Sequence, residues 1–204
     1  MAINAATNWY VRVAGNALNG GGYDSTISGA GTNYADADAA ILSLTDFATS
    51  GAGSTTLTSA TGGFTAAMVG NCVRMASGTN FQAGYYFITV YTDTNTVTLD
   101  RTPSSGGAGS GGTGRVGGAF ATPWGNFSTG GTVTTPTITS PLAAGHTVWI
   151  RGAGLDTPAS VNYSMGNNYS TYVNGTQTLR IKWIGYNGRP RIDAEMFAFN
   201  KVEH

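Results

Sequence analysis

Short runs of apolar and β-branched residues recur along this chain, and glycine, asparagine or aspartate separates most of them. Residues 9–13 alternate between two faces, which is typical of a strand with one buried side. Similar runs predict further strands at residues 55–59, 72–76, 85–92, 96–101, 147–151 and 178–184, with a last extended segment starting at Arg191. The pattern therefore predicts a mainly β protein.

One segment, residues 33–46, predicts a short helix instead. Asn33 is suited to an N-cap, and two aspartates follow where a helix N-terminus favours carboxylates. Apolar residues then recur on one helical face, at Ala37, Ile41 and Leu44. The alternation of residues 42–45 supports a strand as the competing interpretation.

Composition divides the chain into parts. Residues 104–118 are rich in glycine and serine, which predicts a flexible connector or a long surface loop with no core of its own. We expect an N-terminal strand and turn, a small inserted β module, this connector and a C-terminal region, at residues 1–32, 33–103, 104–119 and 120–204.

The charge content is low for a soluble domain and limits the partners. Charged residues make up 10% of the 204 residues, and the formal net charge is zero. A neutral chain offers no large basic surface, so neither nucleic acid nor a membrane is an expected partner. The first residues lack the pattern of a secretory signal, and no apolar run is long enough for a membrane span.

The single cysteine, Cys72, excludes an internal disulfide and a cysteine-based zinc site. Its apolar neighbours, among them Val73 and Met75, predict a buried and inert thiol. His146 is the only internal histidine and lies just before a predicted strand, where it is interpreted as a turn or packing residue rather than a catalytic base.

The remaining polar groups do not indicate an enzyme. The only glutamates, Glu195 and Glu203, lie near the C-terminus, so a glycosidase pair is unsupported. Basic residues at 180–191 followed by Asp193 are interpreted as a solvated, turn-rich edge. The segment 93–95 lacks the acidic set of a calcium loop, and the glycine-rich segment lacks the lysine of a phosphate loop. We therefore expect no catalytic residue, no metal ligand and no cofactor.

Four segments resemble a known family in their order along the chain. They are residues 9–16 with the glycines after Asn19, then residues 122–124, then residues 145–151, and then residues 181–193 with the pattern Gly-Tyr-Asn-Gly-Arg-Pro-Arg-Ile-Asp. Together they resemble right-handed parallel β-helix proteins of the pectate-lyase-like kind. This resemblance implies strands that stack in successive coils. Polysaccharide lyases of this architecture display their catalytic groups over several coils, and this chain has too few coils for such a groove.

The inserted region carries a second resemblance. Residues 34–46, 61–70, 84–86 and 93–101 are similar to a β module that recurs in structural proteins of tailed phages. The two resemblances together imply a short right-handed parallel β-helix-like region with an inserted small β-barrel or sandwich. They also imply a virion setting, with assembly in the host cytoplasm.

We expect a structural component of a tailed-phage virion, above all a capsid decoration (cement) protein that contacts copies of itself and other virion proteins such as the major capsid protein. A base protein of a head or tail fibre or spike is the alternative within that class. A carbohydrate-binding or polysaccharide-degrading module is the alternative of another class, because exposed aromatics stack on sugars. The expected contact residues are Tyr163, Tyr169, Tyr172, Trp183, Tyr186, Phe197, Phe199 and Val202.

The C-terminal segment, residues 196–202, alternates like a strand. It could pair with a neighbouring subunit or fold back on its own domain, and the sequence favours neither.

Overall fold

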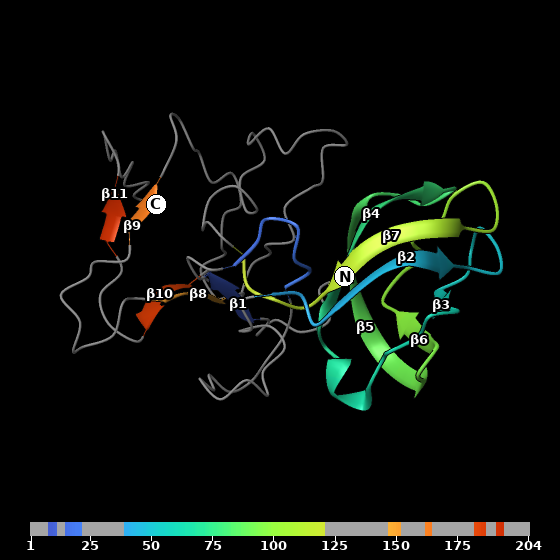
Figure 1. The fold of residues 1–204 in the computed structure, drawn as a ribbon, viewed down its shortest axis with the longest axis horizontal. Helices are drawn as coiled ribbons and strands as arrows, with labels where there is room; N and C mark the ends of the chain where they lie inside the picture. Colours follow the sequence, from blue (N-terminus) through green and yellow to red (C-terminus); the bar gives the residue numbers. More distant parts are fainter. Residues whose placement is uncertain are drawn as a thin grey trace, which may run out of the picture.

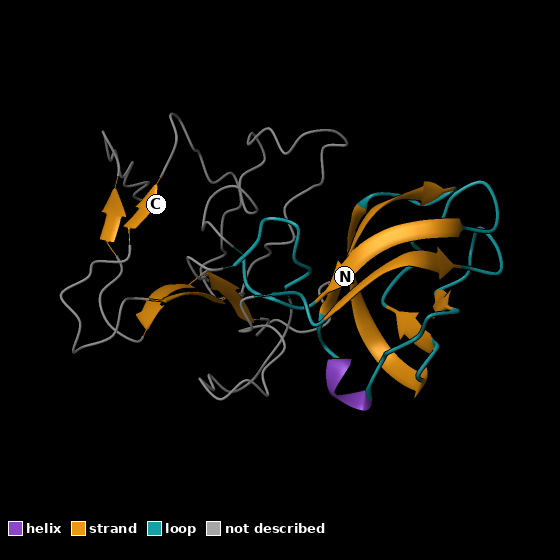
Figure 2. Cartoon of the chain, viewed as in Figure 1, coloured by secondary structure: helices purple, strands orange, loops and turns teal. Residues whose placement is uncertain are grey.

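A computed structural model describes part of the chain, namely residues 8–11, 15–21, 39–120, 147–151, 162–164, 182–186 and 191–193. These residues are mainly β, as predicted, and form a closed barrel together with two short parallel sheets (Figures 1 and 2). The one helical element among them is the 3-10 turn η1 (Ala66–Met68).

The barrel is built from six antiparallel strands that follow one another in sequence. They are β2 (Leu42–Ala48), β3 (Thr56–Ser59), β4 (Cys72–Thr79), β5 (Gly84–Asp93), β6 (Thr96–Leu99) and β7 (Ser110–Val116). Their order around the barrel is β2-β3-β6-β5-β4-β7. Because β7 pairs with both β4 and β2, the sheet closes on itself, and closure removes the free edges that an open sheet would expose.

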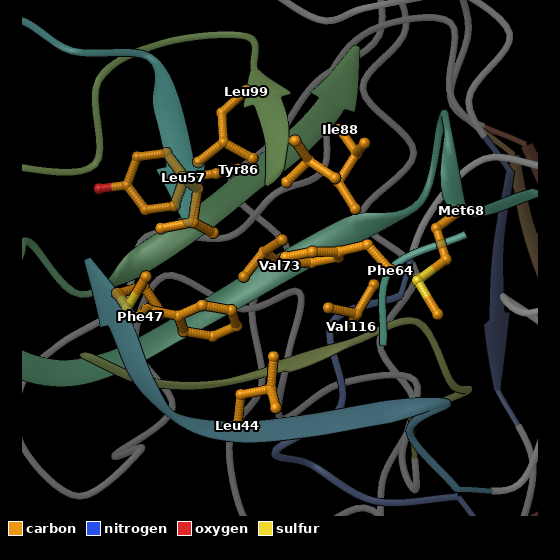
Figure 3. Close-up of a cluster of buried hydrophobic side chains, with 12 residues drawn as sticks. Leu44, Phe47, Leu57, Phe64, Met68, Val73, Tyr86, Ile88, Leu99 and Val116 are labelled. Carbon is orange, nitrogen blue, oxygen red and sulfur yellow. The ribbon is translucent and has the colours of Figure 1, made fainter. Parts of the chain in front are cut away.

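The interior of the barrel is a packed apolar core to which every strand contributes (Figure 3). Phe47 and Phe64 belong to this core, with their ring centroids 6.2 Å apart. The other buried members are Leu44, Leu57, Met68, Val73, Met75, Tyr86, Ile88, Val97, Leu99 and Val116. The predicted strands at 55–59, 72–76, 85–92 and 96–101 are confirmed as β3 to β6, and their apolar positions supply much of this core.

The predicted helix at residues 33–46 is wrong where the structure describes it, because residues 42–48 form strand β2. Its pairing with β7 is irregular between Leu44 and Phe47. Leu44 and Phe47, on either side of this bulge, both belong to the barrel core. The helix face predicted from Ala37, Ile41 and Leu44 is not a buried face, since Ile41 is 36% exposed. Residues 33–38 lie outside the described residues.

The predicted connector at residues 104–119 is also corrected, because residues 110–116 form β7, the strand that closes the barrel. Two of its glycines, Gly112 and Gly114, are required by close packing. A Cβ at Gly112 would lie 2.8 Å from the Cβ of Phe47, and one at Gly114 would lie 2.6 Å from the backbone oxygen of Arg74. A glycine-rich segment can therefore be a central strand when large neighbouring side chains fill the space that it leaves.

The second part of the structure consists of parallel strands. β1 (Asn8–Val11), β8 (Thr147–Arg151) and β10 (Lys182–Tyr186) form one sheet in the order β1-β8-β10. β9 (Asn162–Ser164) and β11 (Arg191–Asp193) form a second, two-stranded parallel sheet. The barrel is thus inserted between β1 and its sheet neighbour β8 (Figure 1).

We expect Gly114→Ala to lower the free energy of unfolding by about 1–3 kcal/mol, because the added methyl group collides with β4 backbone and the Phe47 ring. Urea denaturation followed by circular dichroism measures this loss. Gly53→Ala is the control, since a Cβ at that position meets no atom within 4 Å. Equal stability of the two variants would contradict the role assigned to Gly114.

Candidate assembly site

In the described part of the chain, the sheet formed by β1, β8 and β10 has one edge that is paired and one edge that is not. On one side, Val11 of β1 forms a parallel bridge with Phe120, whose N–H donates to the Tyr10 carbonyl at 2.9 Å. On the other side, β10 pairs with β8 and with no further described strand. An unpaired strand edge presents backbone donors and acceptors that another strand can complete.

The chain runs twice through the two parallel sheets, first as β8 and β9 and then as β10 and β11. We call each of these two segments a pass, and their strands pair in register. Lys182 lies opposite Thr147 in the first pair of strands, and Arg191 lies opposite Asn162 in the second. The second pass is therefore parallel to the first at both places, so each pass extends the sheets that the previous one began.

An aromatic cluster, formed by Trp9, Tyr85, Phe87 and Phe120 and here called the aromatic seam, joins β1 to the barrel. The Trp9 ring lies 5.7 Å from Phe87 and 5.9 Å from Phe120, and Phe120 meets Tyr85 edge-on at 6.0 Å. All four side chains are buried. Because the intervening Tyr86 points into the barrel core, the alternation of β5 turns Tyr85 and Phe87 to its outer face. The seam thus fixes the parallel sheet to the outside of the barrel.

Residues 15–21 cover the neighbouring strands beside this seam. The Cys72 N–H donates to the Gly21 carbonyl at 2.9 Å, and the Gly20 N–H donates to the Gly117 carbonyl at 2.9 Å. A Cβ at Gly20 would collide with the carbonyl oxygens of Cys72 and Arg115, so glycine is needed for this close approach.

Cys72 is fully buried, which confirms the sequence prediction of a buried thiol. It lies outside the barrel core, because its neighbour Val73 points inward. Burial raises the pKa of the Cys72 thiol well above its ordinary value, and the negative charge of Asp100 raises the pKa further. The thiol is therefore protonated at neutral pH, which makes it a poor nucleophile.

A charged group supports the barrel side of the seam. Arg101 donates to the Asp100 carboxylate at 2.7 Å and to the backbone carbonyl of Tyr85. Its guanidinium also lies 4.5 Å from the centre of the Tyr86 ring, a cation–π distance. Asp100 in turn accepts the Phe87 N–H at 2.9 Å. These contacts hold the backbone of β5 where it presents the seam aromatics.

The structure places three of the predicted contact residues in strands. Trp183 and Tyr186 belong to β10, and Tyr163 belongs to β9. Trp183 is in register with Val148, which in turn is in register with Trp9. The other predicted contact residues lie outside the described residues, namely Tyr169, Tyr172, Phe197, Phe199 and Val202.

Sequence reasoning missed the role of Phe120, which links β1 to the end of the barrel. It also missed Arg74 and Arg115, which face each other on adjacent barrel strands. The available signal for Arg74 was a lone basic residue inside an apolar run, at a position where a buried strand carries apolar side chains.

Among the described residues, no three His, Cys, Asp or Glu side chains gather as they would around a metal ion. The described part also contains no helix with the length and apolar character needed to cross a membrane. No known protein family, no curated protein and no solved structure matches this chain.

We expect Trp9→Ala to accelerate labelling of Cys72 by a thiol reagent in the native protein. Trp9 packs against Gly21, whose carbonyl accepts the Cys72 N–H. Removing the ring therefore loosens the segment 15–21 that covers Cys72. The measurement is the labelling rate at low denaturant, and the only cysteine of the chain gives the signal.

Leu57→Ala, in the barrel core, is the control because it lowers the global stability by about 2–5 kcal/mol without touching the cover. We expect the labelling rate of Leu57→Ala to be the rate that its global free energy of unfolding allows. We expect Trp9→Ala to be labelled faster than its own global free energy of unfolding allows. Rapid labelling of the unaltered protein would refute the burial of Cys72.

Proposed function

We propose that this chain is a structural component of a tailed-phage virion, and specifically a capsid decoration protein that acts through contacts between subunits. The observation that carries the proposal is the pair of parallel passes, β8–β9 and β10–β11, in which β10 is the last strand of its sheet and has no further strand neighbour in the described part. Such an edge is suited to completion by another polypeptide.

The finer fold belongs to the same proposal. We assign the passes β8–β9 and β10–β11 to the first coils of a right-handed parallel β-helix, with β1 starting the stack. The parallel pairing of the strands and their order along the chain support this assignment. A short stack of coils leaves apolar groups and backbone edges at its end, which a partner has to cover.

The barrel contributes rigidity in this proposal. Its closed sheet leaves no strand edge for pairing, and the aromatic seam holds the parallel sheet against it. A neutral chain with few charges also has little long-range repulsion between copies, which favours dense packing on a particle. Copies of this chain and the major capsid protein are the proposed partners.

The copy number of this chain in purified virions tests the proposal. A decoration protein occupies sites over the whole capsid surface, so quantitative mass spectrometry is expected to find it in amounts comparable to those of the major capsid protein. A small fraction of that amount would assign it to a fibre or spike base instead. Absence from the particle, or saturable binding on a glycan array, would refute a decoration role.

Photo-crosslinking tests the contact edge directly. We expect a photoreactive amino acid in place of Lys182, on β10, to crosslink to a neighbouring chain in assembled particles. The control replaces Val90, which is 51% exposed on barrel strand β5. Crosslinks from position 90 but none from position 182 would contradict assembly through the β10 edge.

A further inference from the structure

Two arginines lie side by side on the outer face of the barrel. Arg74 of β4 and Arg115 of β7 are direct partners across the antiparallel pair, and Ser43 of β2 is the partner of Arg115 on its other side. Residues directly opposite each other in a sheet project from the same face, with their Cβ atoms about 4.5–5.5 Å apart. Two like charges in this arrangement repel each other unless an anion lies between them.

Arg74 is buried, with 4% of its surface exposed. Its Nε is a buried donor with no hydrogen-bond partner, and the described part of the structure shows no ion pair to its guanidinium. Such burial is costly for a charge that lacks a partner. A guanidinium group keeps its positive charge in proteins, so this cost has to be offset by a partner.

A cavity of about 200 Å³ opens to solvent beside these arginines. Both line it, together with the hydroxyl-bearing residues Ser43, Thr45 and Thr113. Leu18, from the segment that covers the barrel, forms part of its rim, and the remaining lining residues are Leu44, Ala76 and Gly114. The lining thus combines two permanent cations with three hydroxyl groups, of which that of Thr113 is hydrogen-bonded to Ser77 Oγ at 2.7 Å.

Among the described residues, no carboxylate lines this cavity, and two aspartates of the barrel are engaged elsewhere. Asp46 accepts hydrogen bonds from Ser59 Oγ at 2.6 Å and from the Thr61 N–H at 2.7 Å. Asp100 is paired with Arg101. The positive charge of the cavity is therefore not balanced by the described part of the chain.

From this arrangement we propose that the cavity between Arg74 and Arg115 binds a doubly charged tetrahedral oxyanion, either free phosphate or sulfate or the same group at the end of a small ligand. Two guanidinium forks match the oxygens of such a group, and its charge balances theirs. A single carboxylate would balance only one of the two arginines. The volume is below the roughly 300–1,000 Å³ of sites for larger ligands, so one such group with few further atoms fills it.

This site is separate from the β10 edge and does not depend on an assembly role. It also explains how the chain tolerates a buried arginine on a barrel strand. With the anion bound, both guanidinium groups gain charge-assisted hydrogen bonds, and the repulsion between them is replaced by attraction to a shared partner.

Thermal unfolding of the full chain, at constant ionic strength with sodium chloride replaced stepwise by sodium phosphate or sodium sulfate, tests the proposal. A ligand that binds the folded state raises the midpoint Tm in proportion to the logarithm of its concentration once the site is saturated. We expect this rise for the unaltered protein with both anions, and a much smaller one with acetate.

Arg74→Met keeps much of the side-chain volume and removes the charge. We expect this variant to lose the anion-specific rise in Tm and, in chloride alone, to be at least as stable as the unaltered protein, because no buried charge remains. Arg115→Gln, at the less buried position, is expected to reduce the response as well. This second variant provides the test if the first fails to fold.

Arg101→Met is the matched control, since it removes one arginine of the same barrel outside the cavity. We expect it to keep the full anion response even if its Tm in chloride is lower. An equal rise in the Arg74→Met and unaltered proteins would show a general salt effect and overturn the proposal, as would a response to acetate as strong as that to phosphate. A larger rise with glycerol phosphate than with inorganic phosphate would identify a group carried on a ligand, and the reverse a free anion.

Discussion

Every strand edge of a sheet needs a partner, and the described part of this chain meets this requirement in two different ways. The barrel meets it by closure, because β7 bonds to β2 on one side and to β4 on the other. The parallel sheets meet it by stacking, because each pass of the chain pairs with the next. Closure is complete within one chain, whereas stacking always leaves a last strand. The barrel therefore has no strand edge left to pair, whereas the parallel sheet ends, in the described part, at a strand with one unpaired edge.

The aromatic seam makes these two parts one unit. Trp9 belongs to the first strand of the parallel sheet, and its ring packs against barrel residue Phe87 and against Phe120 just beyond the barrel. Phe120 also bridges to Val11, so the chain leaving the barrel returns to the strand that preceded it. The entry and exit of the inserted barrel are thereby held together.

Much of the fold follows from the sequence, and the errors have physical causes. Alternation and turn residues located β3 to β6 because those strands have one face in the core and turns of ordinary chemistry, such as the Asp93–Asn95 turn. β2 was mistaken for a helix because the spacing of Ile41 and Leu44 fits a helix face, although Leu44 is buried in the barrel and Ile41 is exposed. β7 was mistaken for a connector because its core space is filled from neighbouring strands, including the ring of Phe47. Contacts from other strands are not visible in a local pattern.

The arginine cavity could not be predicted for the same reason. Arg74 and Arg115 are far apart in sequence, and only the pairing of β4 with β7 brings them opposite each other. The chain has ten basic residues in all, and two of them face each other at a cavity that no acidic residue of the described part lines. An apolar or hydroxyl side chain in place of Arg74 would avoid the cost of burying a guanidinium. The charge is therefore better explained by an anion that it binds than by the stability of the barrel alone.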